Sequence, residues 1–317
     1  MLSRTAENLY WMSRYIERAE NNARILDVSY RMSLLPSVAD QEVLHWRPAL
    51  LIGPESTSFD ERYSEATGPN VIAYMALDAE NPSSIYSALK TARENARAER
   101  TSITSEMWES LNATWLEIKD VDYAALERRG FRAFFDWIKE RSHLIRGVTV
   151  GTMLKDDAFH FIRLGTFLER GDNTARILDV KYHVLLPETE TVGGAVDYYQ
   201  WGALLRSVSA FRSYRAAYRD AMKPWQIAEL LILRADMPRS LHACLEEVVS
   251  TLDRLAGPNT LECQRLAGAI HASLRFGRIE RIFQQGLHEF LDEFIVRNND
   301  LGNQIHRDFL MTAAIEL

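Results

Sequence analysis

Two stretches of the chain repeat the same polar side chains at helical spacing. Residues 15–30 read YIERAENNARILDVSY and residues 167–182 read FLERGDNTARILDVKY, so ten of sixteen positions are identical at an offset of 152. In each stretch a glutamate, an asparagine and an arginine stand at i, i+4 and i+7, which places them on one helix face. With the arginine that follows each glutamate, the residues are Glu17, Arg18, Asn21 and Arg24 in the first stretch and Glu169, Arg170, Asn173 and Arg176 in the second. Carboxylates beside guanidinium groups can form ion pairs, hold a charged ligand or take part in acid–base catalysis.

An apolar seam runs beside this polar row, so we expect the row to be partly buried. Buried charges persist only when they are paired and hydrogen-bonded. If the two helices meet, Glu17 is expected to pair with Arg176, and Glu169 with Arg24. Three interpretations stay open: an ion-pair network that fixes helix register, a ligand or catalytic site, and a face for docking a partner.

A second group of arginines occurs in the first copy of the repeated sequence and has no counterpart in the second copy. Arg93, Arg97 and Arg100 lie on one helical face of the segment TARENARAER, whereas the corresponding residues 247–256 contain one arginine, Arg254. Three guanidinium groups on one face are suited to binding carboxylate or phosphate. The alternative is a solvated face whose partners are nearby glutamates on the same helix.

Several other chemistries are disfavoured by composition and motifs. No Walker A, G-x-G-x-x-G or G-x-S-x-G motif occurs, and two cysteines are too few for a disulfide framework or a cysteine-rich zinc site. Two Glu-x-x-His pairs occur, Glu42/His45 and Glu140/His143, but a chain with 8 His and many Glu can contain two such pairs by chance, so we predict no metal and no cofactor. The net charge is −7, which argues against a nucleic-acid partner.

The composition predicts the elements that must position these residues. Only 15 Gly and 9 Pro occur in 317 residues, and no strong strand pattern is present, which favours an all-α protein. The order of the weaker matches, at offsets of 152 to 156, predicts an internally duplicated helical bundle with a pseudo-two-fold relation between its halves, 1–151 and 152–317. No glycine- or proline-rich linker separates the halves, so we expect one continuous helical body.

We expect about five helices in each half of the chain. Residues 53–70 are expected to form a mobile loop. The chain has no segment typical of a signal peptide or a membrane span, so a cytoplasmic location and no membrane partner are expected. The predicted helices are 4–34, 39–52, 70–79, 82–118 (with a possible break) and 122–150, then 152–185, 193–222, 225–235, 238–256 and 260–300.

These motifs resemble the Alpha-E family, an α-helical domain named for its ER motif. The resemblance rests on NLYWMSRYIERAEN at 8–21, on ARENAR at 92–97 followed by Arg100, Trp108 and Asn112, and on RLG at 163–165 followed by ERGD at 169–172. Pro238-Arg239-Ser240 and GLHEFL at 286–291 resemble its C-terminal motifs, which adds Arg239 to the candidate binding residues. Gly171 stands where the family more often has alanine. The resemblance runs almost end to end, which predicts a stand-alone member.

The resemblance implies partners rather than a reaction. Members of the family are associated with circularly permuted ATP-grasp proteins and with transglutaminase-like peptidases, and such systems are thought to build or modify peptides through amide bonds. The leading hypothesis is a helical accessory protein, without catalysis of its own, that binds an ATP-grasp-type ligase or an acidic peptide through its ER and arginine faces. The alternatives are an enzyme with a Glu/Arg site between the two halves, and a regulator that binds phosphate or nucleotide.

Overall fold

A computed structural model describes residues 1–34, 42–51, 56–183, 194–258 and 260–310. All regular secondary structure in these ranges is helical, which confirms the all-α prediction. The first half contains α1 (Ser3–Ser33), α2 (Glu42–Leu51), α3 (Ser56–Asp60), α4 (Gly68–Ile72), a π-helical turn (Ala73–Leu77), α5 (Ile85–Ala98), α6 (Ser105–Ile118), α7 (Tyr123–Arg129) and α8 (Phe131–Thr152). The second half contains α9 (Asp157–His183), α10 (Ala195–Ser207), α11 (Phe211–Ala217), α12 (Pro224–Ile232), α13 (Leu241–Ala256), α14 (Glu262–Arg275), α15 (Ile279–Gln285), α16 (Leu287–Ile305) and a second π-helical turn (His306–Leu310).

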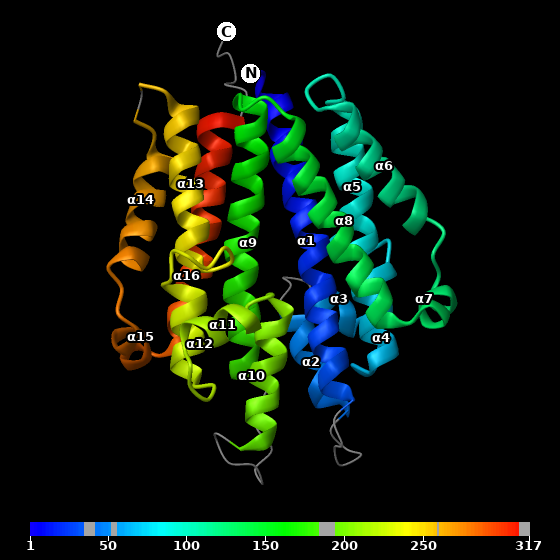
Figure 1. Ribbon diagram of the computed structural model, residues 1–317. Coiled ribbons are helices and arrows are strands. Elements are labelled where there is room, and N and C mark those ends of the chain that lie inside the picture. Colours follow the sequence, from blue (N-terminus) through cyan, green and yellow to red (C-terminus); the bar gives the residue numbers. More distant parts are fainter. Residues whose placement is uncertain (35–41, 52–55, 184–193, 259, 311–317) are drawn as a thin grey trace.

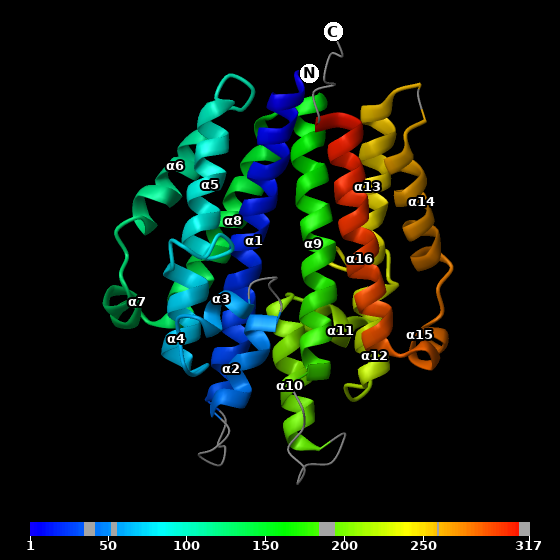
Figure 2. The same cartoon turned by 180° about the vertical axis from the view of Figure 1, so that it is seen from behind.

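The helices that carry the two ER stretches, α1 and α9, lie side by side at the centre of the bundle (Figures 1 and 2). On one side α5 and α8 pack against α1, and on the other side α13 and α16 pack against α9. Outside these, α6 contacts α5 and α8, and α14 contacts α13 and α16 in the same manner. The same pattern of neighbours therefore surrounds each central helix.

The predicted apolar seam forms the contact between the central helices and the rest of the core. Apart from Tyr30, which is half-buried, its described members are almost fully buried in one continuous apolar cluster. Tyr182, the last predicted member of the seam on α9, lies among the residues whose side chains the structure does not describe. The buried seam consists of Met12, Ile16, Ala19, Ala23 and Leu26 on α1 and of Leu164, Leu168, Ala175 and Leu178 on α9.

Several predicted long helices are broken, and two of the breaks occur at glycines. Gly130 (φ 89°) divides the predicted helix 122–150 into α7 and α8, and Gly286 (φ 106°) divides α15 from α16 within the predicted helix 260–300. Positive φ is accessible to glycine at little cost, so the chain can turn sharply at these points. Further breaks separate α10 from α11 and α14 from α15, where single helices were expected, and α5 from α6, where a break was considered possible.

The starts of α5 and α13 differ slightly from the predicted starts at Pro82 and Pro238. The hydroxyl oxygen of Ser84 or Ser240 accepts a hydrogen bond from the backbone N–H three residues further on, at 3.0 Å in both helices. This is N-capping by serine, which satisfies a backbone donor that the first helical turn leaves unpaired. The serine caps, rather than the prolines, therefore fix where these helices begin.

The loop expected at 53–70 is partly helical. Residues 52–55 lie outside the described ranges, but α3 occupies 56–60 and α4 begins at Gly68. The hydroxyl of Thr67 caps α4, and the Phe59 side chain is fully buried and stacks on the ring of Tyr63 at 4.9 Å. Burial of aromatic rings therefore anchors the described part of this segment. None of the described helices is both long enough and apolar enough to cross a bilayer.

Candidate functional site

The two ER dipeptides bind each other across the contact between α1 and α9. The carboxylate of Glu17 accepts hydrogen bonds from Nε and Nη2 of Arg170, both at 2.9 Å. In the reverse direction, the carboxylate of Glu169 accepts from Nε of Arg18 at 2.7 Å and from Nη2 at 3.2 Å. Each glutamate thus forms a bidentate ion pair with the arginine of the other helix. Both carboxylates are almost completely buried.

The predicted pairings of Glu17 with Arg176 and of Glu169 with Arg24 were wrong, because α1 and α9 run parallel and in register. Residues about 152 positions apart lie at the same level, whereas Arg176 and Arg24 stand seven residues beyond that level, about 10 Å along the axis. Each of these arginines instead pairs within its own helix. Arg24 binds Glu20, four residues earlier, and Arg176 binds Asp172 with Nε at 2.7 Å.

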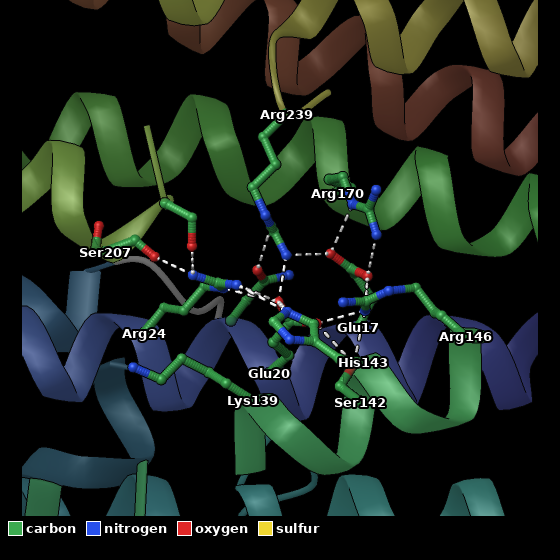
Figure 3. Close-up of polar contacts among 12 residues, drawn as sticks. Glu17, Glu20, Arg24, Lys139, Ser142, His143, Arg146, Arg170, Ser207 and Arg239 are labelled. Carbon is green, nitrogen blue, oxygen red and sulfur yellow. Dashed lines mark hydrogen bonds and ion pairs between the residues drawn. The ribbon is translucent and has the colours of Figure 1, made fainter. Parts of the chain in front are cut away.

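The Glu17 end of this network is extended by arginines from two further elements. Nη1 of Arg146, on α8, lies 2.9 Å from the Glu17 carboxylate and also donates to Glu20. Arg239, which precedes α13, donates to Glu20 and lies 3.2 Å from Glu17. Figure 3 shows these side chains converging on the two carboxylates from three sides. Four segments of the chain are therefore joined at one buried point.

Arg24 connects this network to the segment between α10 and α11. Its Nη1 donates to the backbone carbonyl of Ser207, which is labelled in Figure 3. The same Nη1 also donates to the hydroxyl of Ser209, at 3.0 Å. Ser209 has φ 58°, a left-handed conformation that costs a non-glycine residue about 1–3 kcal/mol. The hydrogen bonds from Arg24 help to hold the backbone in this unfavourable conformation.

Fewer side chains surround Glu169 than Glu17 in this network. They include Arg14, which the sequence analysis did not select. Nε of Arg14 donates to Glu169 at 2.7 Å, and its Nη1 donates to the hydroxyl of Tyr10 at 3.0 Å. The two predicted asparagines have different roles. Asn173 donates to the backbone carbonyl of Glu169, whereas the side-chain oxygen of Asn21 accepts from Arg239.

Charge is unevenly distributed between the two ends. At the Glu17 end four arginines surround two carboxylates, a formal balance of 4 − 2 = +2. Burial raises the pKa of the Glu17 and Glu20 carboxyls, but the guanidinium groups outweigh it and hold both pKa values below the ordinary range. Burial lowers the pKa of Arg239 to about 10, although Glu20 and Glu17 counteract it. The arrangement keeps the carboxylates ionised.

At the other end, burial again opposes ionisation of Glu169, but Arg18 and Arg14 lower its pKa to about 2. A general base or acid is most effective when its pKa lies near the working pH. Neither ER glutamate meets that condition. Both are instead permanent anions that hold guanidinium groups in place.

The central helices approach closely one turn before the ER pairs. A Cβ atom on Gly165 would lie 2.3 Å from the carbonyl oxygen of Tyr10 and 2.3 Å from Oγ of Ser13. Glycine is therefore required for this backbone contact. Beside it, a cavity of about 20 Å³ lies between α1, α8 and α9 and is bordered by Ser13, Glu17 and Arg146. That volume suffices for one water molecule.

The second predicted group of arginines has a different environment. Arg93 donates to Asn112 at 2.8 Å and is mostly buried, whereas the side chain of Arg97 is 65% exposed and pairs with Glu94 at 2.7 Å. The exposed Arg100 stacks over the ring of Trp108 at 5.0 Å. An accessible surface, the arginine face, is thus formed by Arg97 on α5, Arg100 in the turn that follows α5, and Trp108 on α6. The ER face is not accessible in this way.

Metal binding gains no support from the described parts of the chain. Within them, no three His, Cys, Asp or Glu side chains are grouped so that they could hold an ion. His143, from one of the Glu-x-x-His pairs, instead lies at the rim of the ER network, 3.6 Å from Glu20. The side chain of His45, from the other pair, lies outside the described residues.

Comparison with known proteins decides the family. A model of Alpha-E, described as a predicted alpha-helical domain with a conserved ER motif, matches residues 1–310. The chain belongs to the Alpha-E family. The reciprocal pairs supply a physical reason for the ER motif in this Alpha-E chain, because each dipeptide presents a glutamate to the opposite helix and an arginine to the opposite glutamate.

Relatives of this Alpha-E chain occur in mycobacteria. Uncharacterized proteins of Mycobacterium bovis and Mycobacterium tuberculosis are each 22% identical to it over 320 residues, a match that covers 92% of this chain. The match covers 35% of each relative, so this Alpha-E chain spans about a third of their length. No solved structure matches it.

Proposed function

We propose that this chain is an accessory helical protein of an ATP-grasp-type amide-ligase system and has no catalytic step of its own. It holds an acidic segment of its partner protein or of a peptide substrate. A transglutaminase-like peptidase is a second expected partner. The observation that carries this proposal is that the two sets of arginines have different environments. The arginines of the ER motifs form ion pairs within the bundle, whereas those of the arginine face are exposed to solvent.

The burial of the ER residues supports a scaffolding role. Glu17 and Glu169 are 1% and 3% exposed, and each is fully engaged with guanidinium groups from another helix. An acidic partner would have to displace these carboxylates to bind Arg18 or Arg170, whose side chains are 24% and 10% exposed. The network therefore holds four segments together and maintains the surface on which a partner docks.

The arginine face has the chemistry for an acidic ligand. Arg97 and Arg100 keep their guanidinium groups near solvent, and Trp108 provides an aromatic surface beside them. Guanidinium groups bind carboxylates through two parallel hydrogen bonds, and aromatic and arginine side chains are enriched where protein surfaces bind tightly. A peptide segment with neighbouring acidic residues fits this combination.

The rival function, an enzyme with a Glu/Arg site between the halves, finds less support. The arginines around its two candidate carboxylates keep these groups ionised although burial opposes it, as the pKa of about 2 for Glu169 illustrates. A carboxyl group of that kind neither donates nor accepts a proton readily near neutral pH.

We also propose that the chain arose by duplication of a unit like 1–151, with 152–317 as its second copy related by a pseudo-two-fold axis. Three observations support this history: the parallel, in-register central helices, the reciprocal ER pairs and the recurring neighbours of α1 and α9. In a two-fold arrangement around parallel helices, equivalent residues meet at one level, as the two dipeptides do.

The test is affinity capture of the tagged chain from its source cells, with mass spectrometry of the proteins that co-purify. We expect an ATP-grasp protein, and we expect its recovery to fall strongly in the charge reversals Arg97→Glu and Arg100→Glu. The control is Arg265→Glu on α14. Its side chain is 63% exposed and pairs with a glutamate three residues earlier, as Arg97 does, so it matches exposure and local pairing.

Two outcomes would contradict the proposal. If no ATP-grasp protein is captured at near-native concentration, the assignment of this chain to an ATP-grasp-type ligase system is contradicted. Equal recovery with Arg97→Glu, Arg100→Glu and the control would remove the arginine face as the docking surface. If the ligase is captured, its ATP turnover with and without the Alpha-E chain measures whether docking changes its activity.

A further inference from the structure

A cleft of about 210 Å³ opens near the C-terminal end of α8, between the first turns of α9 and the facing side of α13. It lies about two turns before the ER pairs along α9, and the ring of Phe167 is stacked on by both Arg163 of the cleft and Arg170 of the ER pairs. The cleft is smaller than the roughly 300–1,000 Å³ that drug-sized ligands occupy, so it fits a small molecule or a small part of a larger one.

The charges that line the cleft are mostly positive, in a chain whose net charge is −7. Lys155, Arg163 and Arg254 face a single lining carboxylate, that of Glu247. Nη2 of Arg163 binds Glu247 at 2.5 Å. Among the residues that the structure describes, neither Lys155 nor Arg254 has an ion-pair partner. Two cations thus remain available to an anion that enters the cleft.

Arg163 is held in a fixed orientation. Its guanidinium carbon lies 4.5 Å from the ring centre of Phe167 and 5.9 Å from that of Phe159. Stacking on aromatic rings restricts the side chain before any ligand arrives, which reduces the entropy that binding must remove. The arginine is therefore preorganised for two-pronged contact with an oxyanion.

His160, which also lines the cleft, responds to this positive environment. Burial lowers its pKa, and Arg254 and Arg163 lower it further, although Asp156 and Asp157 act in the opposite direction. Both aspartates already have other partners. Asp156 accepts from the backbone N–H of Phe159 at 3.2 Å, and Asp157 lies 3.6 Å from the N-terminal ammonium group.

The remaining walls provide hydroxyl groups and apolar surface. Ser250 and Thr251 on α13 contribute hydroxyls, while Val150 and Phe159 contribute apolar contacts. Phosphate groups are commonly bound by arginine, lysine and hydroxyl donors together. The apolar wall would contact whatever carries the phosphate. A carboxylate offers fewer acceptor oxygens and less charge to the same donors.

We propose that this cleft binds the phosphate group of a small organic phosphate monoester. The phosphate is held by Arg163, Arg254 and Lys155, and its organic part lies against Phe159 and Val150. Binding displaces Glu247 from part of its contact with Arg163, so this carboxylate competes with the ligand. The site is separate from the ER network and from the arginine face, and the proposal does not rest on the accessory function.

The test is calorimetric titration of the purified chain with phenyl phosphate, inorganic phosphate and benzoate at one fixed ionic strength. We expect saturable binding of phenyl phosphate, stronger than that of inorganic phosphate, because its ring reaches the apolar wall. Benzoate, which has the ring without the phosphate, should bind most weakly. Loss of one charge-assisted contact corresponds to about tenfold in affinity.

Two substitutions should change this affinity in opposite directions. Arg254→Gln removes a cation and should weaken phenyl phosphate binding about tenfold, whereas Glu247→Gln removes the competing carboxylate and should strengthen it. Lys90→Gln, which removes an exposed charge on α5, is the control and should change nothing. All three positions are solvent-accessible, and thermal melting of each variant checks that the fold is kept.

The proposal is overturned if phenyl phosphate shows no saturable binding at millimolar concentration. It is equally overturned if binding occurs but is the same in Arg254→Gln and in the Lys90→Gln control, because the ligand then lies elsewhere. Equal binding of all three anions would show general attraction to positive charge instead of a phosphate site.

Discussion

Glu17 and Arg170, 153 positions apart in sequence, form a two-pronged ion pair with both N···O distances at 2.9 Å. The same contact recurs in reverse between Arg18 and Glu169, 151 positions apart. Both pairs lie between parallel helices, so sliding one helix along the other by a single turn, about 5.4 Å, would break both pairs at once. The reciprocal arrangement therefore fixes the register of α1 against α9.

Neutralising Glu17 should destabilise the protein strongly. Glu17→Gln leaves Arg170, Arg146 and Arg239 with less compensating charge in a buried site, and removing one partner of a buried pair typically costs about 3–5 kcal/mol. We expect a loss of about 3 kcal/mol in the free energy of unfolding, measured by urea denaturation. Glu280→Gln on α15, at an exposed position, is the control and should change stability by less than about 0.5 kcal/mol.

A double-mutant cycle separates the observed pairing from the pairing expected from spacing alone. Glu17→Gln combined with Arg170→Gln should cost less than the sum of the single changes, with a coupling energy of about 1–3 kcal/mol. Glu17→Gln combined with Arg176→Gln should be additive, because Arg176 binds Asp172 instead. Equal coupling in the two cycles would contradict the reciprocal arrangement.

Acid should remove the stabilisation that Glu169 provides. Its pKa is about 2 in the folded protein and near 4.5 ordinarily, so its contribution is complete above pH 4.5 and disappears as the pH falls towards 2. The difference corresponds to about 3 kcal/mol. The gap in unfolding free energy between the wild type and Glu169→Gln should therefore be largest at neutral pH and shrink below pH 4.5. A gap that stays constant down to about pH 3 would refute the lowered pKa.

The close contact at Gly165 predicts a costly substitution. In Gly165→Ala the new methyl group would overlap the Tyr10 carbonyl and the Ser13 hydroxyl, and relief of such overlap in a packed core costs about 1–3 kcal/mol. Gly147→Ala on α8 is the matched control, since a Cβ there has no neighbour within 4 Å. It should stabilise the protein by about 0.5–1 kcal/mol through helix propensity. Thermal melting of both variants measures the contrast, and equal stabilisation of the two variants would contradict the close contact at Gly165.

The two cysteines should be unreactive in the folded protein. Cys244 and Cys263 are both fully buried, and burial raises the pKa of each thiol to about 12. Because the thiolate is the reactive species, a thiol reagent at neutral pH should label neither residue until the chain unfolds. Labelling followed during a urea titration should give two thiols per chain with the unfolding transition. Fast labelling without denaturant would contradict the burial.

Much of the fold and part of the site can be predicted from local sequence. Helical periodicity places Glu17, Asn21 and Arg24 on one face beside an apolar seam, and the repeat identifies Glu169 and its neighbours as their counterparts. The same spacing could also have identified Arg14 and Glu20, which stand three residues either side of Glu17. No local signal indicates Arg146, because it reaches the site from a distant helix.

The sequence by itself determined that the chain is helical, which face of each central helix is polar, and that this face recurs. Those properties depend on residues a few positions apart, whose relative placement is set by the helix geometry. Only the tertiary structure decided that Glu17 binds Arg170 rather than Arg176. That choice depends on the direction and register of two helices, which are set by packing contacts such as Gly165 against Tyr10 and by the helices that surround the pair.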